Sequence, residues 1–321
     1  MKILITGGSG FIGSHLSEFL LKKEHQIVNI DNFNDFYDPQ IKRNNIKNQL
    51  ENKNYTLLEG DIRDESFIKK AFKDQSFDLV VHLAAMAGVR PSIQNPLLYE
   101  EVNVKGTLNI LEACKEFDVK KIVSASSSSV YGNNEKVPFH EEDIVDRSIS
   151  PYASTKKSCE VTSHVYHHLY NLDVIQLRFF TVYGPKQRPD LAIHKFTKMI
   201  YEGKEIPFYG DGTSKRDYTY IDDIIDGVYK SILYVMENEN VYEIFNLGES
   251  ETISLTDMVK TIESELNITA KLKRLEQQPG DVFQTYADIS KAKSILGYNP
   301  TTNFKNGIEK FVEWFLEANK E

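Results

Sequence analysis

The chain has 321 residues, of which 40% are hydrophobic and 26% are charged, a composition typical of a soluble globular protein with one large domain or two coupled ones. Its net charge of −9, without a long basic run, argues against a nucleic-acid-binding surface. Two cysteines, no apolar stretch near the ~18 residues that span a bilayer, and no signal-peptide pattern lead us to expect a cytoplasmic protein that is neither membrane-bound nor disulfide-rich.

Short apolar runs alternate with helical patterns along the first part of the chain. The predicted strands are Lys2–Thr6, Gln26–Ile30, Tyr55–Glu59, Leu79–His82, Lys121–Ser124 and Val174–Leu177. The predicted helices are Phe11–Lys23, Ser66–Lys73, Leu97–Phe117 and Tyr152–Tyr170. Apolar strands separated by helices indicate an α/β fold with a doubly wound parallel sheet.

The regular alternation ends near residue 180. Turns such as 210–212, short strands and helices follow, including Thr256–Leu266 and Ile308–Leu316. This change predicts a smaller mixed α/β domain that closes over the carboxyl ends of the strands, where ligands bind in such folds. Because no linker separates the two parts, we expect them to interleave, with 1–180 and about 217–247 in the sheet domain and about 181–216 and 248–321 in the smaller domain.

A glycine motif, Gly7-x-x-Gly10-x-x-Gly13, follows the first predicted strand and opens the first predicted helix. Glycines in this position permit a tight turn and let a pyrophosphate approach the helix N-terminus, whose free N–H groups favour anions. Asp31 ends the second strand, where a carboxylate can bind the adenosine ribose hydroxyls and would repel a 2′-phosphate. An ordinary turn residue is the other interpretation of Asp31. Together, the motif and Asp31 predict NAD rather than NADP.

Two further segments extend the predicted cofactor site. Asp61 and Ile62 follow the third strand and could bind the adenine, while 83–85 follow the fourth strand and leave room for the nicotinamide ribose. The predicted cofactor-binding residues from these segments are Gly7, Gly10, Phe11, Ile12, Gly13, Asp31, Asn32, Asp61, Ile62, Leu83, Ala84 and Ala85.

Tyr152 is the only tyrosine in the chain that is followed four residues later by a lysine, Lys156. Positions i and i+4 lie on one face of a helix, so the phenol and the ammonium can act together. A free phenol is a poor base at neutral pH, and a nearby positive charge favours the phenolate. Upstream, the serine run 126–129 offers a hydroxyl that can bridge substrate and phenol. An exposed pair on an amphipathic helix is the alternative, but beside an NAD site the set predicts the oxidation of an alcohol.

These motifs resemble those of the extended short-chain dehydrogenase/reductases, specifically the nucleotide-sugar 4-epimerases. The resemblance runs from Gly7 to Asp281, nearly the whole chain. It implies a Rossmann fold in which the sheet domain binds NAD and the smaller domain binds a UDP-sugar. The shared motifs are Gly7/Gly10/Gly13, Asp31-Asn32, Asp61-Ile62, Ala84-Ala85, Asn103, 126–132, Tyr152/Lys156 and 216–218.

The same resemblance implies roles for the central residues. Tyr152 would be the acid/base, Lys156 would bind the nicotinamide ribose and lower the pKa of the tyrosine, and Ser127 would supply the bridging hydroxyl. Asn103 is expected to be structural and to bond backbone groups near the active site. Lys156 therefore joins both the predicted catalytic set and the predicted cofactor set.

The residues after Ser127 bear on the reaction. By resemblance, sugar-nucleotide 4,6-dehydratases carry an Asp-Glu pair there and decarboxylases carry a Glu, whereas this chain has Ser128 and Ser129. Without a carboxylate at this position, we expect simple epimerisation at C4 through a transient 4-keto intermediate. A related decarboxylase or dehydratase stays an alternative, and so does a catalytically silent NAD-sensing protein of the same fold.

Several segments are similar to those of UDP-glucuronate 4-epimerases, which makes UDP-glucuronate, with UDP-galacturonate as product, the expected substrate. They are 32–39, 87–90, 178–185, 188–190 and 278–282. Thr181 stands where UDP-galactose 4-epimerases have an Asn, and Gln278 replaces their diphosphate-binding Arg. Thr285 replaces a bulky Tyr of some hexose-specific relatives, so UDP-glucose and N-acetylated UDP-hexoses stay alternative substrates.

The remaining polar side chains are assigned to the UDP-sugar. The hydroxyls of Ser128, Ser129 and Thr181 could bind the C6 carboxylate. Arg216 is the first candidate for the diphosphate, and the planar guanidinium of Arg188 could bind diphosphate or carboxylate. The predicted substrate-binding residues are Gly88, Arg90, Ser128, Ser129, Thr181, Arg188, Arg216 and Asp281.

Two further predictions concern metals and assembly. His164, His167 and His168 lack a neighbouring carboxylate or a third placed ligand, so we expect a surface or subunit-contact face rather than a zinc site. Both cysteines fall in helical patterns and are expected to be buried or half-buried. The helical stretches Asn103–Phe117 and Ser158–Tyr170 match, by resemblance, those of the family's homodimer bundle, so a homodimer is expected.

Overall fold

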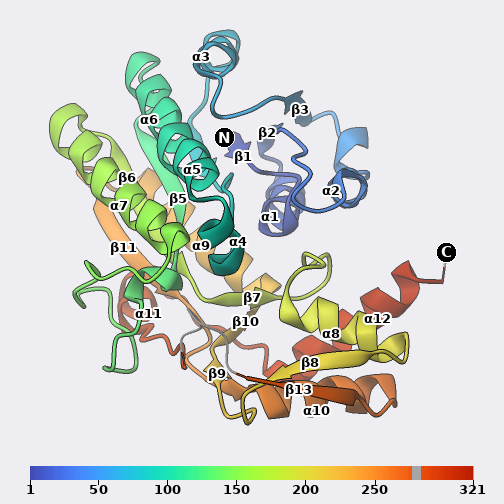
Figure 1. Ribbon diagram of the computed structural model, residues 1–321. Helices are drawn as coiled ribbons and strands as arrows, with labels where there is room; N and C mark the ends of the chain where they lie inside the picture. Colours follow the sequence, from blue (N-terminus) through green and yellow to red (C-terminus); the bar gives the residue numbers. More distant parts are fainter. Residues whose placement is uncertain (277–282, 321) are drawn as a thin grey trace.

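A seven-stranded sheet forms the centre of the protein in the computed structural model, which describes residues 1–276 and 283–320 (Figure 1). Every neighbouring pair of its strands is parallel, and the chain runs outward from β1 first to one side and then to the other. The predicted doubly wound parallel sheet is therefore confirmed. In spatial order the strands are β11 (Tyr242–Leu247), β6 (Asp173–Phe179), β5 (Lys121–Ser127), β4 (Leu79–His82), β1 (Lys2–Thr6), β2 (Gln26–Asp31) and β3 (Tyr55–Glu59).

Helices cover both faces of this sheet (Figure 1). One face packs against α1 (Phe11–Lys22), α9 (Ile221–Glu237) and α11 (Ser290–Leu296), and the other against α3 (Glu65–Asp74), α6 (Gly106–Glu116) and α7 (Pro151–Tyr170). In strand β1 successive side chains alternate between the two faces of the sheet: Ile3 and Ile5 join the core under α1, while Leu4 joins the core under α6. A strand buried on both faces has no polar side, which explains why such runs are continuously apolar.

The long helix predicted over Leu97–Phe117 is interrupted. Instead, α4 (Val89–Gln94) and α5 (Pro96–Tyr99) are followed by a π-helical turn at Glu100–Lys105, which leads into α6. Single π-helical turns frequently accompany functional sites. Here the turn carries Asn103, whose side-chain amide contacts the backbone of Met86.

The carboxyl-terminal part, which includes α8, α10 and α12, gathers along one end of the sheet (Figure 1). Its strands form three pairs: β7 (Thr181–Tyr183) with β10 (Tyr218–Tyr220), β8 (Glu205–Tyr209) with β13 (Lys271–Leu275), and β9 (Lys215–Arg216) with β12 (Ile253–Ser254). The expected interleaved division into two domains stays a prediction. Strand β11 is part of the central sheet, and helix α9 packs against that sheet. The remaining helices are α2 (Pro39–Asn45), α8 (Ala192–Tyr201), α10 (Leu255–Leu266) and α12 (Phe304–Ala318), with 3₁₀ turns at Gln49–Glu51 and Ser128–Tyr131.

Two simple properties complete the description. Within residues 1–276 and 283–320, no helix combines the length and the apolar character needed to cross a membrane. Cys114 and Cys159 are buried and unpaired, as predicted from their helical positions.

Candidate active site

A cavity of about 400 Å³ lies at the carboxyl ends of the central strands. It collects most of the predicted site residues from segments far apart in the sequence. All the predicted cofactor residues line it, as do the three predicted catalytic residues and five of the predicted substrate residues. These are Gly7, Gly10, Phe11, Ile12, Gly13, Asp31, Asn32, Asp61, Ile62, Leu83, Ala84, Ala85, Lys156, Tyr152, Ser127, Gly88, Ser128, Ser129, Thr181 and Arg188.

The glycine turn connects β1 to α1 at one end of this cavity. Gly7 has a positive φ of 72°, and its N–H donates to the Ile30 carbonyl at 2.7 Å. A Cβ on Gly13 would lie 2.3 Å from the Gly7 carbonyl oxygen, so only glycine permits this packing. Gly10, at the N-cap of α1, supplies no capping side chain, which leaves N–H groups of the first turn free to face an anion.

Asp31 lies at the end of β2 beside this turn. Its carboxylate accepts hydrogen bonds from the N–H groups of Ser9 and Phe33 at 3.1 and 2.9 Å. Burial raises the pKa of Asp31, and the Lys42 ammonium, 4.0 Å away, opposes that effect. The turn interpretation and the cofactor interpretation are therefore compatible, because the carboxylate bonds the turn and also lines the cavity.

Lys42 was not predicted from the sequence, although it also lines the cavity. Its Nζ donates to the Asn34 carbonyl at 3.0 Å and lies 5.1 Å from the centre of the Tyr37 ring. Burial lowers the pKa of this lysine, and Asp31 partly restores it. It stands on α2, and nothing in the local pattern of that helix distinguishes it from the neighbouring surface lysines.

Asp61 and Ile62 follow β3 on the same side. Partial burial of Asp61 opposes its ionisation, but hydrogen bonds from Arg63 and Asn32 outweigh this effect and lower its pKa to about 2. Its carboxylate is therefore ionised and held by Arg63 at 2.8 Å. The adenine assignment of this pair stays a prediction.

The three predicted catalytic residues face the cavity from two elements. Ser150 caps α7 by accepting from the Ala153 N–H at 3.1 Å, which places Tyr152 in the first turn and Lys156 one turn later. Lys156 is buried, and its Nζ donates to the Ala125 carbonyl of β5 at 2.7 Å. Ser127 ends the same strand and accepts the N–H of Ser129 at 3.1 Å. Lys156 is thus buried and Tyr152 is half-buried at the cavity, which argues against the surface-pair interpretation.

Asn103 connects two segments that border the cavity. Its side chain accepts the Met86 N–H at 2.8 Å and donates to the Met86 carbonyl at 3.0 Å and to the Thr155 hydroxyl at 2.9 Å. Thr155 precedes Lys156 on α7, so the amide links the segment after β4 to the catalytic helix. The prediction that Asn103 bonds backbone near the site is confirmed.

Ser128, Ser129 and Thr181 line both this cavity and a second one of about 190 Å³ that adjoins it. Arg216 and Thr285 belong to the second cavity. The three hydroxyls predicted to bind the C6 carboxylate, those of Ser128, Ser129 and Thr181 (the hydroxyl cradle), therefore lie at the junction of the two cavities.

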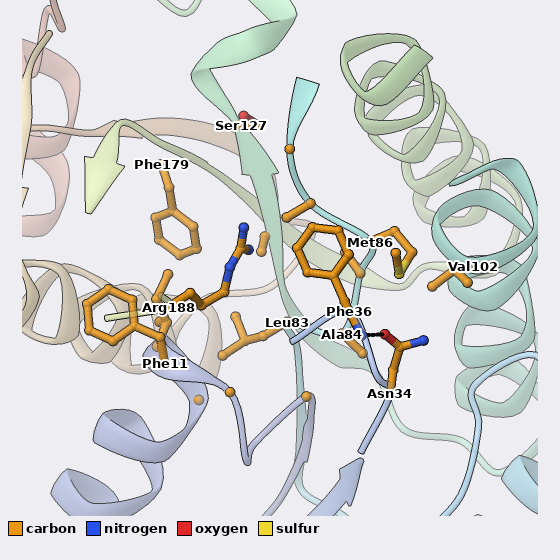
Figure 2. A pocket seen from close by; sticks show the side chains of 18 of the residues that line it. Phe11, Asn34, Phe36, Leu83, Ala84, Met86, Val102, Ser127, Phe179 and Arg188 are labelled. Carbon is orange, nitrogen blue, oxygen red and sulfur yellow. Dashed lines mark hydrogen bonds between the residues drawn. The ribbon is translucent and has the colours of Figure 1, made fainter. Parts of the chain in front are cut away.

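Arg188 reaches into the large cavity near Phe11, Leu83 and Phe36, as Figure 2 shows. Its guanidinium lies 5.4 Å from the centre of the Phe36 ring and forms two hydrogen bonds with Asp190, at 2.9 and 2.7 Å. Phe36, from the loop after β2, also lines the cavity. It was not among the predicted site residues. The arginine therefore lies beside the cofactor residues and not in the second cavity.

Two predicted substrate residues are not among the lining of these cavities. Arg90 is not part of the lining of either cavity, and its guanidinium lies 5.1 Å from the centre of the Tyr209 ring. Asp281 lies outside the described residues, as does Gln278, which replaces the diphosphate-binding Arg of related enzymes. The roles of Arg90 and Asp281 in substrate binding stay predictions.

The histidines of α7 show no metal arrangement. The rings of His164 and His167 lie near Tyr242, with ring centres 4.8 and 5.8 Å from it. Within 1–276 and 283–320, no group of three or more His, Cys, Asp or Glu side chains is placed to hold a metal ion.

Comparison with known proteins decides the family. The model of the family described as GDP-mannose 4,6 dehydratase matches residues 4–311. The chain belongs to this family. Its members are extended short-chain dehydrogenase/reductases, so the resemblance seen in the motifs is confirmed. The family model alone does not choose among dehydration, decarboxylation and epimerisation.

Individual relatives are more specific. A UDP-glucuronate 4-epimerase of Thermodesulfobacterium geofontis is 44% identical over 315 residues, covering 98% of this chain and 96% of the relative. The structure of UDP-glucuronic acid 4-epimerase from Bacillus cereus with UDP-glucuronic acid and NAD matches with a TM-score of 0.92 and 38% identity, over 99% of this chain and 100% of that one. The Thermotoga maritima UDP-glucose 4-epimerase with UDP-glucose gives a TM-score of 0.90 and 31% identity, with coverages of 99% and 100%.

Proposed function

We propose that this extended short-chain dehydrogenase/reductase is an NAD-dependent epimerase that interconverts UDP-glucuronate and UDP-galacturonate by inverting C4 of the sugar. One observation carries the proposal: Tyr152, Lys156 and Ser127 share a cavity with the glycine turn, and serines follow Ser127 where carboxylates would serve elimination. The two UDP-glucuronate 4-epimerases reported above support the choice of sugar.

The residues present fit NAD. The backbone around the turn leaves no space for a side chain at Gly7 or Gly13, and the free N–H groups at the start of α1 favour an anion such as the pyrophosphate. Asp31 and Lys42 would bind the adenosine ribose hydroxyls as acceptor and donor. Lys156 would bind the nicotinamide ribose. When bound, NAD takes the hydride from C4 of the sugar and later returns it.

The acid/base chemistry falls to Tyr152. As phenolate it would accept the proton of the C4 hydroxyl, and it would return that proton when the 4-keto group is reduced from the opposite face. Lys156 lies one helical turn after Tyr152, and the hydrogen bond from its Nζ to the Ala125 carbonyl holds the ammonium against β5. Ser127 would donate to the C4 oxygen. One residue thus serves both halves of a reversible reaction.

The sugar carboxylate can be lost as CO₂ from the 4-keto intermediate, and the hydroxyl cradle can prevent this side reaction. A 4-keto uronate is a β-keto acid, which loses CO₂ when the carboxylate lies suitably against the carbonyl. Ser128, Ser129 and Thr181 line the junction of the two cavities, where their hydroxyls can hold the carboxylate in another orientation. We expect Thr181→Val to increase the fraction of UDP-pentose relative to epimer; an unchanged product ratio contradicts this role.

Substrate assays test the proposal directly. The purified protein is incubated separately with UDP-glucuronate, UDP-glucose and UDP-N-acetylglucosamine, and products are separated by chromatography and identified by NMR. Epimer from UDP-glucuronate is expected. Epimer from the neutral sugars alone rejects the glucuronate assignment, and UDP-pentose from the wild type indicates a decarboxylase.

A tyrosine variant separates an enzyme from a silent NAD-binding protein. Tyr152→Phe keeps the ring and its edge-on packing against Tyr99, with ring centres 6.2 Å apart, and removes only the hydroxyl. General acid/base catalysis contributes about 10²- to 10⁴-fold, so turnover is expected to fall by that factor while NAD stays bound. Full turnover in this variant would remove Tyr152 from the mechanism.

A homodimer is part of the same proposal. Helix α7 exposes Val161, Val165 and Leu169, with exposed fractions of 54%, 44% and 58%. Their spacing of four residues places them on one stripe of the helix, a pattern that a second copy of the helix can cover. Sedimentation should give twice the mass of 36.9 kDa, and Val165→Glu should shift the protein toward monomer.

A cytoplasmic location is proposed from the cysteines. Cys114 and Cys159 are free thiols in the interior, a state that a reducing compartment maintains. Fractionation of cells that produce the protein tests this location.

A further inference from the structure

A buried ion pair lies behind the serine segment of the candidate site. Glu160 on α7 and Arg178 on β6 each expose only 1% of their side chains. The Arg178 Nε and Nη2 donate to the two Glu160 carboxylate oxygens at 2.8 and 2.9 Å. This two-pronged geometry is the most specific that an arginine and a carboxylate can form.

Glu160 connects the pair to the catalytic residues on one side. It follows Lys156 by one helical turn, so both side chains leave α7 toward the sheet. The Ser126 hydroxyl donates to Glu160 Oε1 at 2.7 Å. Ser126 immediately precedes Ser127, so the beginning of the serine segment is tied to the helix that carries Tyr152.

Arg178 connects the pair to the other end of the same segment. Its Nη1 donates to the Tyr131 hydroxyl at 3.0 Å and to the Glu141 carbonyl at 3.2 Å. The Tyr131 hydroxyl in turn donates to Asn246 Oδ1 at 2.7 Å. Tyr131 ends the 3₁₀ turn that begins at Ser128. Both ends of 127–130 are therefore held by one ion pair whose anion stands on the catalytic helix.

Stability alone is a poor explanation for such a pair. Removing two charges from water costs several kcal/mol each, and replacing a buried pair by apolar side chains of similar volume is often neutral or stabilising. An apolar pair between α7 and β6 would pack as well but would leave Ser126 and Tyr131 without these partners. The contacts to the serine segment are what only the charged pair supplies.

We propose that Glu160 and Arg178 are positioning residues that set the placement of Ser127, Ser128 and Ser129 against Tyr152. This inference rests on the proposed epimerase function. Disturbing the pair displaces the bridging hydroxyl from the C4 oxygen and loosens the carboxylate cradle. A displacement of about 1 Å can cost about 100-fold in rate. The rate of hydride return should fall most, because this step requires the 4-keto sugar to be held after it has turned over.

The test uses variants that leave no unpaired charge in the interior; Lys157, which also contacts Glu160 at 3.3 Å, is 30% exposed and keeps access to water. Glu160→Leu with Arg178→Met removes the whole pair, while Ser126→Ala and Tyr131→Phe each remove one tie and keep the pair. The matched control is Lys121→Met with Asp173→Asn. Lys121 and Asp173 form a mostly buried ion pair at 2.8 Å between β5 and β6, at the amino ends of these strands and so at the other end of β6 from Arg178.

Melting temperature, NAD affinity, kcat, KM and products from UDP-glucuronate are measured for each variant. We expect the Glu160/Arg178 double variant to lose about 10- to 100-fold in kcat, with NAD affinity within about threefold of wild type. During turnover it should accumulate reduced cofactor, seen by near-ultraviolet absorbance, and release CO₂ and UDP-4-keto-pentose, the decarboxylated sugar that has not taken the hydride back. Ser126→Ala and Tyr131→Phe should show the same changes to a smaller degree, whereas the control pair should change only the melting temperature.

The results that would contradict the positioning role differ from the result that would contradict the proposed function. A folded double variant with wild-type kcat and products overturns the positioning role, and so does an equal loss of kcat in the control pair. If the double variant does not fold, the two single variants decide, and wild-type kcat in both overturns the role. A wild type that epimerises no UDP-sugar rejects the proposed function, and the positioning role with it.

Discussion

Glu249 should make the protein less stable as the pH rises. One of its carboxylate oxygens, Oε2, is buried without a hydrogen-bond partner among residues 1–276 and 283–320. Burial, with the negative charges of Asp223, Asp217 and Glu251, raises the pKa of Glu249 from 4.5 to about 8, and the Lys293 ammonium only partly opposes this effect. The folded protein therefore keeps a proton on Glu249 that the unfolded chain has already lost at neutral pH.

The sign and size of the effect follow from this difference. Between about pH 4.5 and pH 8 the folded state binds more protons than the unfolded state, so the free energy of unfolding falls as the pH rises through this window. The two pKa values correspond to at most about 5 kcal/mol, and solvent screening of the partly exposed carboxylate reduces this to about 1–2 kcal/mol. Glu249→Gln removes the charge at nearly constant shape and should restore that amount above pH 8.

Thermal unfolding of both proteins from pH 5 to pH 8.5 measures the effect. The melting temperature of Glu249→Gln should exceed that of the wild type by about 2–5 °C at pH 8.5, and the difference should shrink toward pH 5. Glu239→Gln is the control, because Glu239 is exposed and is not among the charges that raise the pKa of Glu249, so this variant should keep the pH dependence of the wild type. A difference that stays constant with pH for Glu249→Gln would refute the reasoning.

Three further outcomes are expected. Lys42→Met should weaken NAD binding about tenfold, measured by calorimetry, because it removes a charged donor near Asp31. Lys47→Met, at an exposed position, should not weaken NAD binding, and equal affinities of the two variants would contradict the role of Lys42. Gln176→Met should raise the melting temperature by about 2 °C, because neither Gln176 amide atom has a partner in the described part of the chain; a lower value would mean that the amide is satisfied. Gly13→Ala should abolish NAD binding, because the added Cβ would lie 2.3 Å from a carbonyl oxygen. In Gly10→Ala the corresponding distance is 3.3 Å, so this variant should fold and bind NAD more weakly than the wild type. A larger loss of NAD affinity in Gly10→Ala than in Gly13→Ala would contradict the turn geometry.

Much of the sheet could be predicted because its central strands are buried on both faces and its strands are short runs rich in apolar residues. Lys2–Thr6, Tyr55–Glu59 and Leu79–His82 have the observed bounds. The predicted strand at Lys121–Ser124 extends to Ser127, because its polar last residues pair with β6 through backbone groups that apolar patterning does not reveal. The helix break at Glu100–Lys105 was also missed, since it depends on contacts of Asn103 with Met86 and Thr155, which are remote in the sequence.

The candidate site divides in the same way. Spacing along one element encoded the glycine turn and the Tyr152–Lys156 pair, because a turn and a helix fix the relation of nearby residues directly. Lys42 and Phe36 join the site only because the chain after β2 folds back beside α1 and the glycine turn, and no local pattern marks that return.

The sequence by itself determined the fold class, the family, the glycine turn and the spacing of Tyr152 and Lys156, since each depends on residue types at short, regular spacings. Tertiary structure decided which distant groups meet. It placed Arg188 near the cofactor residues, joined the two cavities at Ser128, Ser129 and Thr181, and tied the serine segment to α7 through Glu160 and Arg178. The physical reason is that strand register and the packing of helices on the sheet set distances between remote segments, and those distances are properties of the whole fold.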